Sequence, residues 1–323
     1  MKKPLIKKKY KIALLVLLII CIASYISSVA ILYNSGYRLS NYKEDAKKFL
    51  GFDSRLFNAE TWFENTIATT KQAKYTINKD IDSINIISNN SDIRIYPNNS
   101  NELSLEFSIS GKESIVKDFN SKEIKFNKNG GTLTFNTENL DSSIDYNTIN
   151  ISIPKSYNKN LTIKPTLSQI SIINLNLNNL NIKGDTSSVE LSDIKATNVD
   201  VETLGDISCT NSNFKNSKIK NDNGKIYCNG YFGNSSIECY SGEIDFSFTK
   251  LGSSTSISNT HGIINIYNRG NVSDYSLNAK TRNGEIIALN DKTFDKKIYT
   301  KKFGNGKDIL SIKSTESGVI NIN

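Results

Sequence analysis

Three charged residues stand directly after repeated glycines, and their spacing would bring them together if the chain coils regularly. Asp206, Lys225 and Glu243 follow one another at intervals of 19 and 18 residues. On successive coils they would form a row of alternating charge, which could bind a cation or a sugar. The alternative is a solvated ladder of exposed ion pairs, each worth at most about 1 kcal/mol. No pair of carboxylates shares a coil in a way that suggests acid–base catalysis, so we predict no catalytic residues.

A second group of side chains that could bind a ligand lies near the C-terminus. It combines five lysines with two aromatic residues: Lys296, Lys297, Lys301, Lys302 and Lys307, with Tyr299 and Phe303. Clustered positive charge attracts anionic polymers or lipid head groups. We expect either a contact for an anionic polymer of the cell wall or a solvated loop. Glycines at 304 and 306 favour a turn here, as in a hairpin.

The histidine and the cysteines do not predict a metal or cofactor site. His261 is the single histidine, and it precedes a repeated glycine where the other repeats carry unrelated residues. Cys21 lies in an apolar stretch, and the intervals between Cys209, Cys228 and Cys239 do not fit the clustered ligands of a zinc site. An odd number outside that stretch argues against a disulfide framework, although a bridge between Cys209 and Cys228 stays open. We predict no cofactor and no metal.

The element that must position these residues is a repeated step, Gly-x-Ile. Its apolar residue recurs at intervals of 19, 18, 19, 18, 20 and 22 residues: Ile170, Val189, Ile207, Ile226, Ile244, Ile264 and Ile286. The residue two places further faces the same way in a strand, and in every copy it is small or apolar: Ile172, Leu191, Cys209, Cys228, Phe246, Ile266, Ala288 and Ile322. Such repeats bury their apolar face by stacking. We predict an all-β fold, a β-solenoid with about 18–20 residues per coil.

Strand patterns begin before the regular repeats. Alternating apolar residues from Tyr75 onward predict an irregular first part, 75–165, and regular coils over 166–323. A last copy of the step, Gly318–Ile320, follows the lysine-rich stretch. We expect it to close the stack.

The N-terminal region predicts a membrane anchor. Six of the 40 basic residues lie in 1–11, so most of the net charge of +8 belongs to this tail. Residues 12–33 carry no charge and are long enough to span a bilayer. The positive-inside rule then puts the tail in the cytoplasm and the remainder outside, whereas a cleaved signal peptide would give a secreted protein. Residues 34–74, with two helix-compatible stretches, are expected to form a short helical juxtamembrane stalk or a cap.

The segment from Ile84 to Asn323 resembles a bacterial family of "putative adhesin" domains of unknown function (DUF). The resemblance rests on Asn90–Ile95, Ile151–Lys155, Leu161–Ile163, the Gly-x-Ile steps and Leu310–Ile320. Serine replaces glycine in the first two copies, and the juxtamembrane segment has no counterpart. The resemblance implies a β-solenoid on membrane-anchored envelope proteins, some of them from Gram-positive bacteria, with no known catalytic residues.

These observations favour a non-enzymatic cell-surface protein, either an adhesin or an envelope-stress-associated scaffold. The expected partners are the membrane, crossed once, and a cell-wall polymer or another envelope protein. Nucleic acid is not expected, because the body is extracytoplasmic and its charge is nearly balanced. The alternatives are a polysaccharide-active β-helix enzyme, lyase or hydrolase, and a self-assembling structural solenoid. The sequence leaves the oligomeric state open.

Overall fold

The computed structural model describes residues 66–323, apart from 122–123, 138–143, 271 and 290–292, together with Cys21 and Ser24. The chain divides into two units at Thr66 and Ile67, and the second unit carries the fold. The predicted membrane span, 12–33, lies outside the described residues except for the helical positions Cys21 and Ser24. No helix among the described residues is long and apolar enough to cross a membrane.

The described part of the second unit is built almost entirely of strands, with one helix, α4 (Glu113–Ser121). This confirms the predicted all-β class. The strands are β1 (Thr66–Thr76), β2 (Ser83–Asn89), β3 (Ser91–Asn98), β4 (Glu102–Lys112), β5 (Asn127–Asn129), β6 (Thr132–Asn136), β7 (Ile144–Pro154), β8 (Asn160–Thr166), β9 (Gln169–Ile173), β10 (Asn176–Lys183), β11 (Ser188–Ser192), β12 (Lys195–Thr203), β13 (Ile207–Leu251), β14 (Ser254–Asn268), β15 (Tyr275–Thr281), β16 (Glu285–Ala288), β17 (Thr293–Lys296), β18 (Ile298–Phe303) and β19 (Asp308–Ile322).

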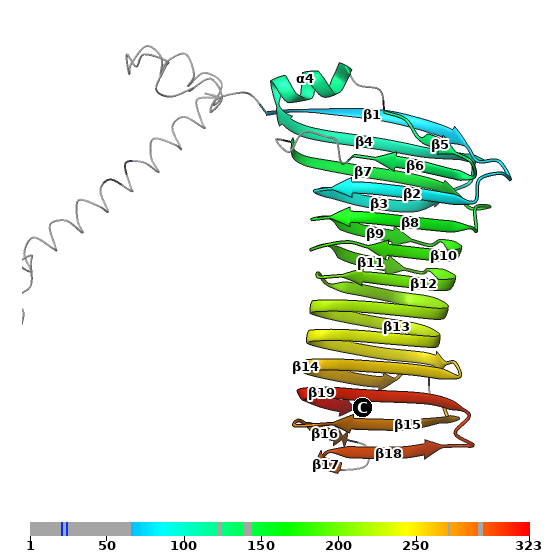
Figure 1. Ribbon diagram of the computed structural model, residues 1–323, viewed down its shortest axis with the longest axis vertical. Helices are drawn as coiled ribbons and strands as arrows, with labels where there is room; N and C mark the ends of the chain where they lie inside the picture. Colours follow the sequence, from blue (N-terminus) through cyan, green and yellow to red (C-terminus); the bar gives the residue numbers. More distant parts are fainter. Residues whose placement is uncertain are drawn as a thin grey trace, which may run out of the picture. The chain divides into compact units, whose positions relative to one another are not determined.

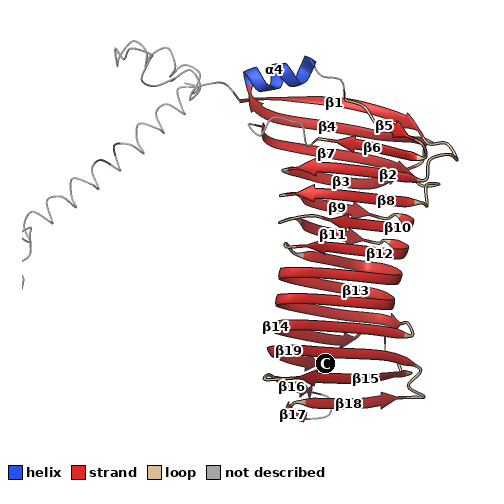
Figure 2. Cartoon of the chain, in the orientation of Figure 1, coloured by secondary structure: helices blue, strands red, loops and turns tan. Residues whose placement is uncertain are grey.

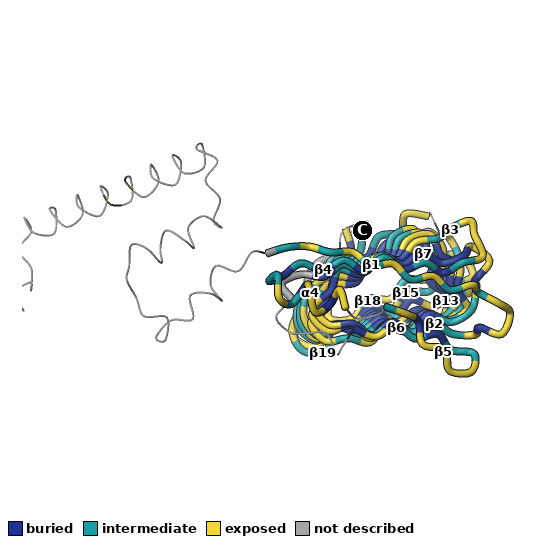
Figure 3. The backbone as a smooth tube through the Cα atoms, turned by 90° about the horizontal axis from the view of Figure 1, so that it is seen from above, coloured by how far each residue is buried: buried dark blue, intermediate teal, exposed yellow. Residues whose placement is uncertain are grey.

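Successive coils stack in parallel and in register (Figures 1 and 2). Val189 pairs with Ile170 on one side and Ile207 on the other, and Ile244 pairs with Ile264. Each coil contributes to two faces, which we call the Gly-x-Ile face and the opposite face. β3, β9 and β11 belong to the first, and β2, β8, β10 and β12 to the second. β13 winds through both without a break, and from above the coils superpose as flattened loops (Figure 3).

The predicted inward column of the Gly-x-Ile face is confirmed. Seven of its residues are at most 2% exposed: Ile172, Leu191, Cys209, Cys228, Phe246, Ile266 and Ala288. The eighth, Ile322, is partly buried against the same core. Cys209 and Cys228 are not bridged, and burial beside the Cys209 thiol raises the pKa of Cys228. The cysteines of the coils therefore serve as small core residues.

The expectation that the last copy of the step closes the stack is wrong, and a strand is inserted out of sequence order at each end of the stack. β2 lies between β6 and β8, and β19 lies between β14 and β15. Ile320 consequently pairs with both Ile264 and Ile286, so the last copy of the step is inserted rather than terminal. The lysine-rich stretch makes this possible, because β18 runs antiparallel to β15 and a second reversal returns β19 parallel to it.

The N-terminal end of the stack is closed by β1, β4 and α4 (Figure 1). The sequence predicts a stalk or cap over 34–74, but strand β1 already begins at Thr66. The predicted boundary at residue 74 therefore lies too far along the chain. The reason is that β4 offers its edge to Ile67–Thr76, whose alternate residues, such as Ile67 and Tyr75, pack on the core. The Lys71 ammonium donates to the Phe119 carbonyl oxygen of α4 at 2.7 Å and lies 4.8 Å from its ring centroid. Residues 34–65 lie outside the described part.

A ladder of asparagine side chains ties the coils together along the opposite face. Each amide nitrogen donates to the amide oxygen of the preceding coil: Asn179 to Asn160 at 2.6 Å, Asn198 to Asn179 at 2.7 Å, Asn216 to Asn198 at 3.0 Å and Asn234 to Asn216 at 3.3 Å. The Ser253 hydroxyl continues the ladder by donating to Asn234 at 2.6 Å. Because every amide bonds its counterpart, the ladder favours a register without slips.

Close backbone approach explains the repeated glycines. Gly242 and Gly262 have φ values of 143° and 130°, a region that side chains rarely adopt. A Cβ on Gly242 would overlap the carbonyl oxygen of Gly224, and one on Gly262 would overlap that of Gly242. The coils can stack closely at these glycines only because glycine has no side chain.

We expect Asn179→Ala to lower the free energy of unfolding by about 1–3 kcal/mol, because it removes two ladder hydrogen bonds of about 0.5–1.5 kcal/mol each. Chemical denaturation followed by circular dichroism measures the change. The matched control is Asn178→Ala, an exposed neighbour outside the ladder, with an expected change within about 0.5 kcal/mol. Equal losses in the two variants would show that the ladder does not stabilise the stack.

Gly242→Ala should cost on the order of 4 kcal/mol or more, since both the backbone conformation and the contact with Gly224 must change. Gly130→Ala isolates the conformational part, because Gly130 also has a positive φ, 56°, but has no atom within 4 Å of the added Cβ. We expect about 1–2 kcal/mol there. Comparable denaturation midpoints for the two variants would contradict the steric explanation.

Candidate functional site

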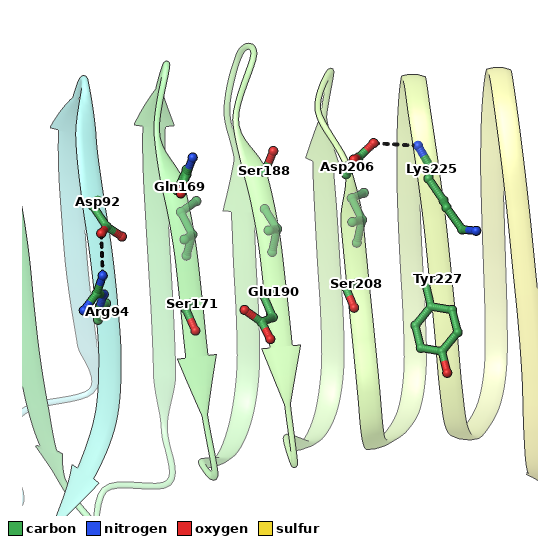
Figure 4. Close-up of a pocket in the computed structure, with 13 residues that line it drawn as sticks. Asp92, Arg94, Gln169, Ser171, Ser188, Glu190, Asp206, Ser208, Lys225 and Tyr227 are labelled. Atoms are coloured by element: carbon green, nitrogen blue, oxygen red, sulfur yellow. Dashed lines mark hydrogen bonds and ion pairs between the residues drawn. The ribbon is translucent and has the colours of Figure 1, made fainter.

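The site with the most varied side chains is a groove on the outside of the Gly-x-Ile face (Figure 4). Two rows of outward side chains line it, and each crosses β3, β9, β11 and two successive passes of β13. The first row is Arg94, Ser171, Glu190, Ser208 and Tyr227, and the second is Asp92, Gln169, Ser188, Asp206 and Lys225. Parallel register creates the rows, since Ser171 pairs with Arg94 and Glu190, and Glu190 pairs with Ser208.

Side-chain length makes this surface concave. Serines stand at three of the central positions, Ser171, Ser188 and Ser208, whereas Arg94 stands at one end and Tyr227 at the other. The resulting volume is about 610 Å³, within the range of ~300–1,000 Å³ typical of ligand sites. The groove follows the axis of the stack, and four strand spacings make it about 19 Å long.

Both cations of the groove are already paired with carboxylates. The Arg94 guanidinium lies 2.8 Å from Asp92 Oδ2. Lys225 Nζ lies 2.6 Å from Asp245 Oδ2 and 3.2 Å from Glu243 Oε2, which belong to the next coil. The groove therefore offers hydroxyl, amide and carboxylate groups rather than unpaired positive charge.

The predicted row of Asp206, Lys225 and Glu243 is confirmed in part. Lys225 and Glu243 form an ion pair, but Asp206 Oδ1 accepts a hydrogen bond from the backbone N–H of Lys225 at 2.7 Å. Sequence reasoning missed Asp245, which is two residues after Glu243 and therefore on the same face. It also missed Asn265, which donates to Glu243 Oε1 at 2.8 Å and to Asp245 Oδ1 at 2.7 Å.

These contacts set the charge state of the network. Burial opposes ionisation of Asp245, but the hydrogen bonds from Lys225 and Asn265 outweigh it and hold the pKa of the Asp245 carboxyl below its ordinary value. The bond to Asp245 in turn raises the pKa of the Lys225 ammonium. Lys225, Glu243, Asp245 and Asn265 thus form a charged network that links neighbouring coils. Their polar groups bond one another.

Four residues of the lysine-rich group, Tyr299, Lys301, Lys302 and Phe303, lie in an edge strand, β18, at the end of the stack. Among the described strands, β18 pairs only with β15. Its two aromatic residues turn toward the core, and Phe303 stacks on Tyr275 at 4.4 Å between ring centroids. Lys301 Nζ lies 4.9 Å from the Phe303 ring centroid, and Lys297 donates to the Gly284 carbonyl oxygen.

The remaining lysines of this group do not converge on one point. Lys296 and Lys302 are exposed and belong to different strands, and the Lys307 backbone N–H bonds Asp274 Oδ1 at 3.1 Å. Lysines on an edge strand discourage pairing with another chain, which gives β18 a structural role. The anionic-polymer contact at these residues stays a prediction.

His261 lies within strand β14 rather than in a turn, beside a register shift where β19 carries one extra residue between Ser314 and Ser317. Its ring meets Tyr240 edge-on at 5.6 Å, and its Nδ1 lies 3.3 Å from Ser317 Oγ. No group of three or more histidine, cysteine or acidic residues in the described part of the chain could hold a metal ion.

Solved structures with a similar chain path include a "putative adhesin" from Parabacteroides merdae (12% identity, TM-score 0.44, 79% of this chain and 96% of that one) and a "putative lipid binding protein" from Parabacteroides distasonis (14%, 0.49, 80% and 98%). A "putative cell adhesion protein" from Clostridium sporogenes shares 13% identity at a TM-score of 0.28, over 79% of this chain and 99% of that one. TM-scores this low support no inference about activity.

No curated protein sequence matches the chain. The profile of one family, Toastrack DUF4097, matches residues 81–323. That range covers most of the chain and confirms the resemblance expected from the Gly-x-Ile steps. The chain belongs to the Toastrack DUF4097 family.

Proposed function

We propose that this chain is a non-enzymatic, membrane-anchored protein of the cell envelope that binds a glycan chain along the groove of its Gly-x-Ile face. The observation that carries the proposal is the pair of rows that run along the stack from β3 to the second pass of β13, from Arg94 to Tyr227. An open site about 19 Å long suits an extended polymer better than a compact metabolite.

The chemistry of the groove supports a sugar polymer. Serine hydroxyls both donate and accept hydrogen bonds, as sugar hydroxyls do. The half-buried Tyr227 adds an aromatic surface with a polar tip at one end of the row. An anionic polymer fits less well here, because Asp92, Glu190 and Asp206 contribute three carboxylates to the lining.

The location rests on the sequence. A basic tail, 1–11, precedes the uncharged stretch 12–33, and this order suits an anchor with a cytoplasmic N-terminus and an extracytoplasmic stack.

The competing function is hydrolysis or lysis of a polysaccharide. Glu190 and Asp206 are the carboxylates that such an enzyme would use in this groove. Hydrolysis needs one carboxylic acid that is sheltered from water, and both side chains are exposed. The groove therefore suits binding better than bond cleavage.

Blocking the groove should abolish binding. We expect Ser208→Trp to fill the floor and to reduce co-sedimentation of the full-length protein, in detergent micelles, with insoluble cell-wall glycan by tenfold or more. Ser256→Trp, an exposed serine on the opposite face, is the matched control and should bind as the unmodified protein does. Undiminished binding by Ser208→Trp contradicts the proposal, and release of reducing or unsaturated ends from the glycan favours the enzyme.

The anchor has its own test. In cells expressing the full chain, we expect the protein in the membrane fraction, with 67–323 degraded by protease added outside. Replacing Ile22 and Ala23 by lysine should remove it from that fraction, since each charge at the centre of a span costs about 2.5–3.5 kcal/mol. Recovery of a shortened chain from the medium would indicate a cleaved signal peptide instead.

A further inference from the structure

We propose that the groove selects glycans bearing free amino groups and that Glu190 is the residue that contacts the ammonium. The inference rests on the proposed function and narrows it from glycans in general to amine-bearing ones. It follows from the charges that remain in the groove once the internal pairs have been accounted for.

Both cations of the groove already form ion pairs within the protein. Arg94 bonds Asp92 within the same strand, and Lys225 bridges Glu243 and Asp245 of the neighbouring coil. A ligand anion would have to compete with one of these carboxylates. The charge of each cation is already balanced, so the groove favours a phosphate or carboxylate polymer less than a cationic ligand.

Glu190 is the exception among the charged residues of the groove. Within the described residues its carboxylate takes part in no ion pair or hydrogen bond, and its direct neighbours across the strands are Ser171 and Ser208. These hydroxyls leave the charge of the carboxylate uncompensated. A positively charged donor on the ligand would complement it, and charge-assisted hydrogen bonds are roughly twice as strong as neutral ones.

The position of Glu190 also suits a polymer. It stands in the middle of its row, with Arg94 two strands away on one side and Tyr227 two strands away on the other (Figure 4). Two strand spacings correspond to about 10 Å. A chain lying along the row meets a serine, the carboxylate and a second serine before it reaches the ring of Tyr227, so an amine near its centre falls beside Glu190.

The chain thus carries two surfaces of opposite preference. The exposed lysines of the β17–β18 end suit anions, whereas the groove, with three carboxylates in its lining, repels them. Of these two surfaces, only the groove attracts an amine-bearing glycan. This separation lets one titration distinguish the two surfaces.

The test compares two glycans of equal length, a glucosamine hexamer and an N-acetylglucosamine hexamer, by isothermal titration of the full-length protein in detergent micelles at low salt and at about pH 6, where amines are charged. We expect the glucosamine hexamer to bind at least tenfold more tightly, equivalent to about 1.4 kcal/mol. Glu190→Gln should remove this preference while leaving binding of the acetylated hexamer unchanged.

The matched control is Glu285→Gln, which removes the same charge on the same face beyond the groove and should leave the preference intact. Equal affinity for the two hexamers in the unmodified protein overturns the inference and leaves the proposed function standing. Binding of neither hexamer overturns both. A lysine-bearing peptide that binds more tightly than either glycan, with the same dependence on Glu190, shows that the partner is a protein and also overturns the inference.

Discussion

A coil of this stack can satisfy its backbone edges and bury its apolar residues only against another coil, and this constraint governs the whole fold. Interior coils meet it by simple parallel stacking. At the ends, the chain leaves the stack and returns, so that β2 and β19 are enclosed by later or earlier strands. Antiparallel pairs, β4 with β7 and β15 with β18, supply the reversals.

The same stacking constraint also determines how the outward side chains are arranged on the surface. Because every coil repeats the register of the last, outward side chains form straight rows along the stack. The asparagine ladder and the glycine contacts maintain this register. Differences in side-chain length along the rows then make the surface concave. Short serines between Arg94 and Tyr227 are enough to make a groove, without a loop or a domain interface.

The alternation of strand residues made the inward column readable from the sequence, because a period of two separates inside from outside at each Gly-x-Ile step. That local rule contains no information on which coil lies beside which. The insertion of β19 next to β14 was therefore missed, as was the pairing of β1 with β4. The groove was missed because it depends on adjacency across β3 and β9, which are more than 70 residues apart in the chain. The ladder could have been found, since Asn160, Asn179, Asn198, Asn216 and Asn234 recur at the spacing of the coils.

The central claim is that the Gly-x-Ile face, rather than the lysine-rich end, carries the ligand site. Hydrogen–deuterium exchange on the full-length protein, with and without a saturating glucosamine hexamer, tests it directly. We predict added protection confined to β3, β9, β11 and the first turns of β13, around Glu190. Protection confined to β17 and β18, with none across the groove, would contradict the claim.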